Sequence, residues 1–138
     1  MVLSQGYGTL SFFSSKDESI FDMLIRAGLK PNSSRVLLSL HYNTGLTSRE
    51  IEKITGLRQP EVSIAIHDLI NRGWILVSEQ CKGDSVRTMK HYRLLHSIDI
   101  VLDSIRTETE DVCKNRVAIL ETIRVRLSEI HGYTGFTD

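Results

Sequence analysis

The residues whose types and spacing could do chemistry lie between Gln59 and His67. Gln59, Ser63 and His67 are four positions apart, so on an α-helix they would share one face. Their side chains can form hydrogen bonds with base edges or phosphate oxygens of a nucleic acid. Ile64 lies beside them and could contact a thymine methyl group. A slightly rotated helix would bury Ile64 in the core instead, and the sequence is compatible with both placements.

Basic residues flank this face in the sequence. Arg49 and Arg58 precede it, and Lys82, Arg87 and Lys90 follow it. Arginine and lysine side chains commonly contact DNA phosphates, which positions a protein without reading the base sequence. The alternative is that they are ordinary surface residues. These five residues are therefore candidate phosphate contacts.

A short helix is predicted to begin after Thr47 and to end at Gly56. Thr47 and Glu50 have the spacing of a capping box, in which each side chain bonds the other residue's backbone N–H. Leu46 and Ile51 have the spacing of a hydrophobic staple. Glycine ends a helix well because it adopts the left-handed conformation at little cost.

The candidate reading face lies on a second helix, which opens at Gln59-Pro60 and closes at Arg72-Gly73. Its core-facing residues recur at helical spacing: Val62, Ala65, Ile66 and Leu69. The opposite face carries Pro60, Ile64, His67 and Asn71, with Ser63 and Asp68 beside them. A β-ribbon is predicted next, because residues 74–79 are β-rich, Gly83-Asp84 can turn the chain, and residues 88–94 return.

The order helix, turn, helix and ribbon resembles the winged helix-turn-helix of the MarR, ArsR and TrmB groups of prokaryotic transcription regulators. The segments that carry the resemblance are LTSREIEKITGL and RQPEVSIAIHDLINRGWI, and RQPEVS looks most like archaeal members. The resemblance implies a mainly α-helical fold with a small β-ribbon. It also implies a regulator of transcription that reads double-stranded DNA with its second reader helix. Winged helices also serve as protein–protein modules, and that alternative stays open.

Two further helices are predicted upstream of this segment. The second covers Pro31–Tyr42, with Val36, Leu37 and Leu40 as its apolar stripe. The first covers Asp17–Ala27, and its expected buried face consists of Ile20, Phe21, Leu24 and Ile25. Residues 1–16 are polar, and we expect a loose arm that tucks Phe12 and Phe13 onto the body. The DNA-binding domain is thus predicted to cover residues 17–96.

A long helix is predicted to begin after Ser97 and to reach about Ile130, within a dimerisation segment of residues 97–131 and before a flexible tail of residues 132–138. Apolar residues repeat at heptad spacing, with Thr109 and Arg116 as defects in the seam. Such a helix would be roughly 50 Å long, which exceeds the diameter of a small domain. We therefore expect a homodimer held through Ile98, Leu102, Ile105, Val112, Ile119 and Ile123.

Composition is compatible with a compact domain in a reducing cytoplasm. The 138 residues are 41% hydrophobic, and the two cysteines, Cys81 and Cys113, lie far apart. The first residues show no basic region followed by a continuous apolar one, so we expect no signal peptide, and no apolar run is long enough to span a membrane. A net charge of zero is unusual for a DNA-binding protein. Residues 82–93, however, hold four basic residues and one acidic one.

Enzymatic and metal-sensing functions have little support in the sequence. No phosphate-binding glycine loop, GxSxG elbow or HExxH motif is present, so no catalytic residue and no cofactor are predicted. Some ArsR-like repressors sense metals, and His91, His96, Cys81 and Cys113 could supply ligands. The spacings of common zinc sites are missing, however. Whether a small-molecule effector binds is not written in the sequence.

Overall fold

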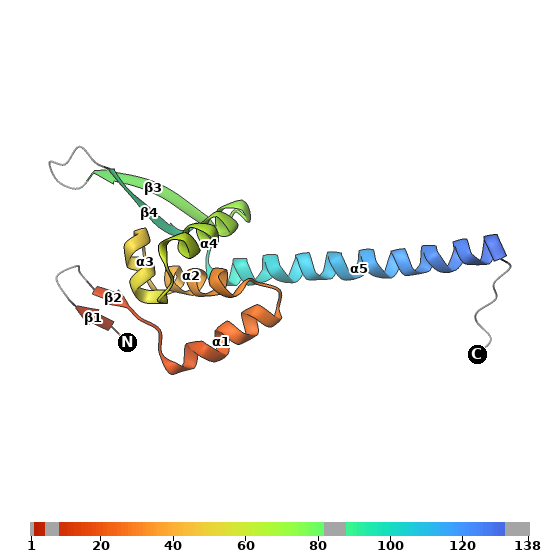
Figure 1. Ribbon diagram of the computed structural model, residues 1–138, viewed down its shortest axis with the longest axis horizontal. Helices are drawn as coiled ribbons and strands as arrows, with labels where there is room; N and C mark the ends of the chain where they lie inside the picture. Colours follow the sequence, from red (N-terminus) through yellow and green to blue (C-terminus); the bar gives the residue numbers. More distant parts are fainter. Residues whose placement is uncertain (1, 5–8, 82–87, 132–138) are drawn as a thin grey trace. The chain divides into compact units, whose positions relative to one another are not determined.

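The computed structural model describes residues 2–4, 9–81 and 88–131 (Figure 1). The chain divides into two compact units, Met1–Val101 and Leu102–Asp138. The first unit has the predicted fold class, helices with a small β-ribbon. In chain order its elements are β1 (Val2–Ser4), β2 (Thr9–Ser11), α1 (Ser15–Arg26), α2 (Pro31–Tyr42), α3 (Ser48–Thr55), α4 (Gln59–Asn71), β3 (Ile75–Cys81) and β4 (Thr88–Leu94).

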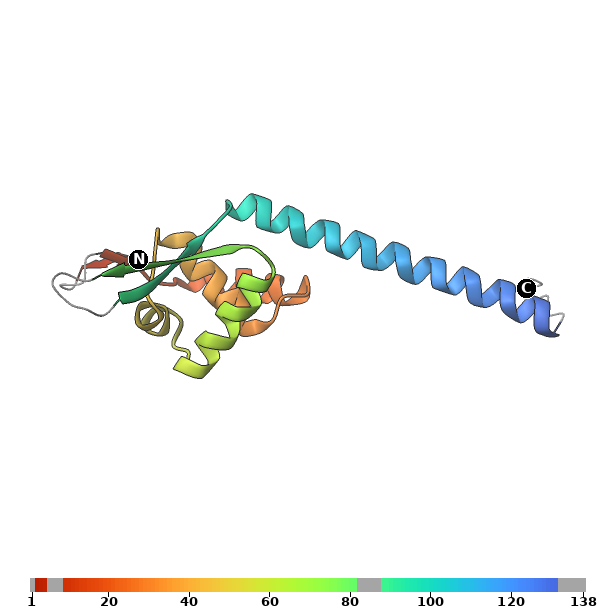
Figure 2. The same cartoon turned by 90° about the horizontal axis from the view of Figure 1, so that it is seen from above.

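The central helix of the first unit is α2, which contacts α1, α3, α4 and β4. The views of Figures 1 and 2, taken at right angles, both show it among its neighbours. Pro31 begins the helix at a position where a missing N–H costs nothing. The apolar core around it is contributed mainly by Phe21, Leu24, Val36, Leu37, Leu38, Leu40, Ile51, Ile54, Val62, Ala65, Ile66, Leu69 and Trp74.

The turn from α3 to α4 forms as its sequence signals predict. The N–H of Thr47 donates to Glu50 Oε1 at 2.9 Å, and the N–H of Glu50 donates to Thr47 Oγ1 at 3.3 Å, which confirms the capping box. Gly56 ends α3 with a φ of 76°, in the left-handed region that favours glycine. The predicted helix-turn-helix is therefore confirmed.

The ribbon that follows α4 is an antiparallel pair of β3 and β4. Its register runs from Ile75 opposite Leu94 to Cys81 opposite Thr88. Leu46, in the connection before α3, adds a bridge to the outer edge of β4. It exchanges two backbone hydrogen bonds with Tyr92, at 2.8 and 2.9 Å. The ribbon root is thus fastened to the helix-turn-helix by backbone bonds.

The N-terminal segment is more ordered than the expected loose arm, because β1 and β2 pair antiparallel from Val2–Ser11 to Ser4–Thr9. The side-chain amide of Asn43 holds β2: its Oδ1 accepts from Ser11 N–H at 2.9 Å, and its Nδ2 donates to Ser11 O at 3.2 Å. An amide side chain here imitates a backbone pairing, a contact that sequence periodicity does not signal.

Helix α1 begins at Ser15, two residues earlier than predicted, because Asp17 acts as a capping residue. The Ser14 N–H donates to Asp17 Oδ2 at 2.6 Å, and the Tyr42 hydroxyl donates to Asp17 Oδ1 at 2.5 Å. Burial raises the pKa of Asp17, but these hydrogen bonds outweigh burial and hold the pKa below its ordinary value. The hydrogen bond to Asp17, together with burial, raises the pKa of Tyr42.

The predicted apolar face of α1 is only partly correct. Phe21 and Leu24 are buried, whereas Ile25 is 40% exposed, so its assignment to the core was wrong. The ring of Phe13 packs edge-on against Phe21 with 4.8 Å between centroids, and this contact confirms that Phe13 folds onto the body. Tyr42 lies on the other side of the Phe13 ring, at 6.5 Å between centroids.

The last element, α5, is one continuous helix from Ile98 to His131, as the sequence predicted. The Ser97 carbonyl accepts from the N–H groups of Ile100 and Val101, so the helix starts directly after Ser97. All side chains from residue 106 to residue 130 are exposed. No helix in residues 9–81 and 88–131 has the length and apolar character needed to cross a membrane.

Candidate nucleic-acid interface

The outward face of α4 carries the residues that sequence analysis selected. Gln59, Ser63 and His67 are exposed, and so is the neighbouring Ile64, with 68% of its surface accessible. The placement in which Ile64 belongs to the core is therefore excluded. An isoleucine this exposed leaves its apolar surface available for contact with another molecule.

The inward face of α4 explains this orientation. Val62, Ala65, Ile66 and Leu69 are all at most 4% exposed, as the helical spacing predicted. They pack against the neighbouring helices α2 and α3. On a helix of about 100° per residue, burying these four residues turns Ser63, Ile64 and His67 to solvent.

Carboxylates near the outward face are engaged within the protein. Glu50 Oε1 accepts from the Thr47 N–H, and Glu61 Oε1 accepts from the Arg58 N–H at 2.9 Å. Asp68, which the helical wheel placed beside the outward face, accepts from the Ser33 hydroxyl at 2.7 Å. Each carboxylate therefore satisfies a donor of its own chain.

The candidate phosphate contacts are distributed around this face. Arg49 in the first turn of α3, Arg58 directly before α4, and Lys90 on β4 are all exposed. Lys82, Arg87 and the predicted turn at residues 83–84 lie outside the described residues. The described part of the ribbon therefore contributes Lys90 to the candidate interface.

Helix α5 carries the candidate dimer residues. Leu102, Val112, Ile119 and Ile123 are between 43% and 59% exposed, whereas Ile105 is only 8% exposed. Leu120, Leu127 and Ile130 are further exposed apolar residues on the same helix. Water-exposed apolar side chains in this number are typical of a surface that pairs with another protein.

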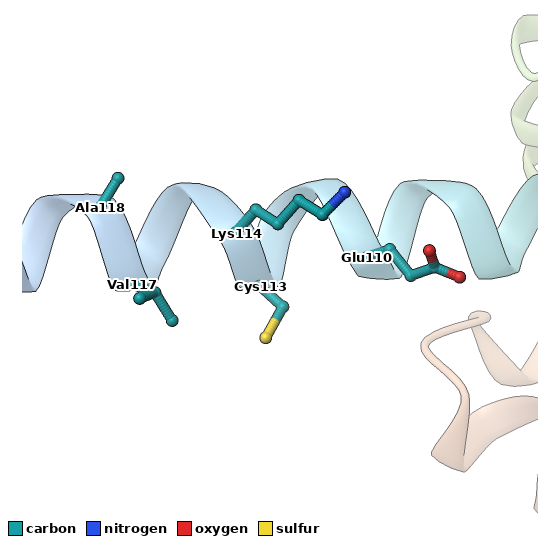
Figure 3. Close-up of a pocket in the computed structure, with 5 residues that line it drawn as sticks. All are labelled: Glu110, Cys113, Lys114, Val117 and Ala118. Carbon is teal, nitrogen blue, oxygen red and sulfur yellow. The ribbon is translucent and has the colours of Figure 1, made fainter.

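A hollow of about 460 Å³ lies along one side of α5 (Figure 3). All of its lining residues come from this single helix: Glu110, Cys113, Lys114, Val117 and Ala118. One helix cannot enclose a ligand, so the hollow is open surface rather than a binding cavity. Within the described residues, no cluster of three or more His, Cys, Asp or Glu side chains could hold a metal ion.

Comparisons with known proteins agree with this geometry. Residues 27–84, which include the helix-turn-helix and the start of the ribbon, match the model of the MarR family. The winged helix-turn-helix of this chain is MarR-like. The predicted resemblance to this group is therefore confirmed. None of the curated proteins compared with the sequence matches it.

Solved structures share the MarR-like fold at low sequence identity. A possible transcriptional regulator from Methanosarcina mazei Go1 is 13% identical, with a TM-score of 0.61, over 88% of this chain and 96% of that one. The archaeal chromatin protein TrmBL2, described as showing a novel mode of DNA binding, is 19% identical, with a TM-score of 0.65. That match covers 90% of this chain but only 44% of TrmBL2. At identities this low, the structural similarity shows a shared fold alone.

Proposed function

We propose that this chain is a transcriptional regulator that binds double-stranded DNA with sequence preference. The observation that carries the proposal is the outward face of α4, where Gln59, Ser63, Ile64 and His67 are exposed together on a winged helix-turn-helix. In this fold the second reader helix enters the major groove. Gln59, Ser63 and His67 would lie nearest the base edges, and Ile64 could touch a thymine methyl group.

The neutral net charge is compatible with this function because the charges are placed unevenly. Three carboxylates beside the reader helices bond to their own chain, whereas Arg49, Arg58 and Lys90 are exposed. The MarR-like segment and the shared fold with TrmBL2, a DNA-binding protein, support the same proposal. A net charge of zero gives only a modest overall attraction to phosphates, and we therefore expect modest affinity for each copy.

We further propose that the chain acts as a homodimer that pairs through α5. The helix has 34 residues, about 51 Å at 1.5 Å per residue, and its apolar side chains from Val112 to Ile130 remain exposed in a single copy. Two-fold dimers read two half-sites about one helical turn apart, which doubles the contacts and raises the effective concentration of the second reader helix.

Selection of genomic DNA fragments by the purified protein tests the proposal. The expected result is enrichment of a small set of fragments that share a pseudo-palindromic sequence. A matched selection with an Ser63→Ala, His67→Ala variant should lose that enrichment while the variant stays folded, because both residues are exposed. Recovery of fragments without a shared sequence, or of none, would instead favour the protein–protein module.

A further inference from the structure

Asp68 lies at the edge between the outward and the buried face of α4, and a buried partner holds it there. Its Oδ2 accepts from the Ser33 hydroxyl at 2.7 Å, across 35 positions of sequence. Ser33 belongs to α2 and is only 1% exposed. The side chain of Asp68 is itself 17% exposed. The hydrogen bond therefore ties the reader helix to the central helix of the unit.

The same carboxylate also lies near Arg72, which in turn contacts Trp74, the residue directly before β3. Arg72 Nε lies 3.5 Å from Asp68 Oδ1, and its guanidinium carbon lies 4.9 Å from the centroid of the Trp74 ring. Trp74 is buried, its backbone N–H donates to Leu69 O, and its backbone carbonyl accepts from the Leu95 N–H. These contacts thus link α2, α4 and the end of the ribbon where β3 begins and β4 ends.

We propose that Asp68 is a positioning residue for DNA sequence preference. In this view the Ser33–Asp68 hydrogen bond between α2 and α4 fixes the rotation of α4 about its own axis. That rotation decides where Ser63 and His67 meet the base pairs. The inference rests on the proposed DNA-binding function and names a residue that acts on specificity without touching DNA.

Apolar packing alone leaves this rotation less well defined. The contacts of Val62, Ala65, Ile66 and Leu69 are non-directional, whereas a hydrogen bond at 2.7 Å constrains both distance and angle. With side chains at a radius of about 5–6 Å, a rotation of about 20° moves their tips by about 2 Å. A shift of that size is enough to break a hydrogen bond to a base edge.

Two substitutions test the proposal without changing the size of the core. Ser33→Ala removes the donor and leaves every charge in place. Asp68→Asn removes the charge in a side chain of equal size, whose amide oxygen accepts a weaker, neutral hydrogen bond from Ser33. Asp22→Asn is the matched control, because Asp22 and Arg26 form an exposed i,i+4 pair at the same 3.5 Å distance on α1. For each protein, we would measure the ratio of the dissociation constants for scrambled and selected DNA. The temperature is chosen so that a thermal melting curve shows the protein to be folded.

We expect Ser33→Ala to lower this ratio by about fivefold or more, the value of one lost base contact. Asp68→Asn should lower it less, but by more than about twofold, because its amide oxygen still accepts from Ser33. Loss of the Asp68 charge can also strengthen binding to every DNA, but that effect cancels in the ratio. The double variant should lose no more than Ser33→Ala alone, because both changes act on the same hydrogen bond. Asp22→Asn should keep the wild-type ratio.

The outcomes separate this inference from the proposed function. A wild-type protein without any preference for selected DNA would refute the proposed function, and the inference with it. A wild-type protein with clear preference, and variants whose ratios stay within about twofold of it, would overturn the positioning role alone. Lower melting temperatures with unchanged ratios belong to that second outcome, since they show that the bond serves stability only.

Discussion

Replacing Ile119 and Ile123 by alanine should dissociate the proposed dimer. The two side chains are 59% and 48% exposed in a single copy, so about half of each remains to be buried by a partner. Full burial of an isoleucine contributes about 1.5–3 kcal/mol, and half of that is about 1 kcal/mol per side chain. A dimer contains four such side chains, so the pair of substitutions should cost about 4 kcal/mol. That cost weakens the dimer about a thousandfold.

The assay is sedimentation equilibrium, with circular dichroism to verify that α5 remains helical. Alanine has the highest helix propensity, so the substitutions should not unfold the helix. The matched control is the pair Val117→Ala and Val125→Ala. These residues are 53% and 55% exposed, but helical spacing places them away from the heptad seam. An unchanged dimer constant in the seam variant, or an equal loss in the control, would refute the proposed pairing.

Three further substitutions probe individual contacts. Tyr42→Phe removes the hydroxyl that holds the Asp17 carboxylate and should lower the free energy of unfolding by about 1–3 kcal/mol near neutral pH. Because the folded pKa of Asp17 is depressed, this contribution is present above the unfolded pKa and is lost as the pH falls through the folded pKa. Urea unfolding should therefore show a smaller stability difference between the wild type and the variant near pH 3 than near pH 7. An equal difference at both pH values would contradict the assignment. Gly56→Ala should lower stability by about 1–2 kcal/mol in thermal melting, because the φ of 76° is strained for alanine although its Cβ would meet no atom within 4 Å; an unchanged melting temperature would show that the turn relaxes. Ile64→Ala should leave stability unchanged and abolish discrimination between thymine and uracil in the selected DNA, which wild-type protein should show by about 1 kcal/mol; equal discrimination by both proteins would place the thymine contact elsewhere.

Local signals in the sequence predicted the reader helices well. The capping box of Thr47 and Glu50 and the left-handed Gly56 depend on residues within one helical turn, so their spacing is sufficient evidence. The buried face of α4 follows from helical periodicity alone, and this face also decides that Ile64 points outward. The candidate DNA contacts remain a prediction, because their exposure shows availability and not binding.

Features that depend on tertiary contacts were missed or misplaced. Strand β2 is held by the side chain of Asn43, which lies 32 residues from Ser11. A polar segment without alternation gives no sign of such a bond. The placement of Asp68 was misjudged for the same reason. The helical wheel places it near solvent, but its hydrogen-bond partner Ser33 lies in another helix. Periodicity describes which face of an element is apolar, and it does not identify the partners of polar residues at the edge of that face.

The central claim, sequence-preferring DNA binding by the α4 face, is tested most directly by one titration. Fluorescence anisotropy would compare selected and scrambled duplexes at about 50 mM and about 200 mM salt, with wild-type protein and a His67→Ala variant. We expect saturable binding that weakens with salt for both duplexes, a clear preference of wild type for the selected duplex, and a smaller preference in the variant. Equal binding of both duplexes by the wild-type protein, or no saturable binding at either salt concentration, would contradict the claim.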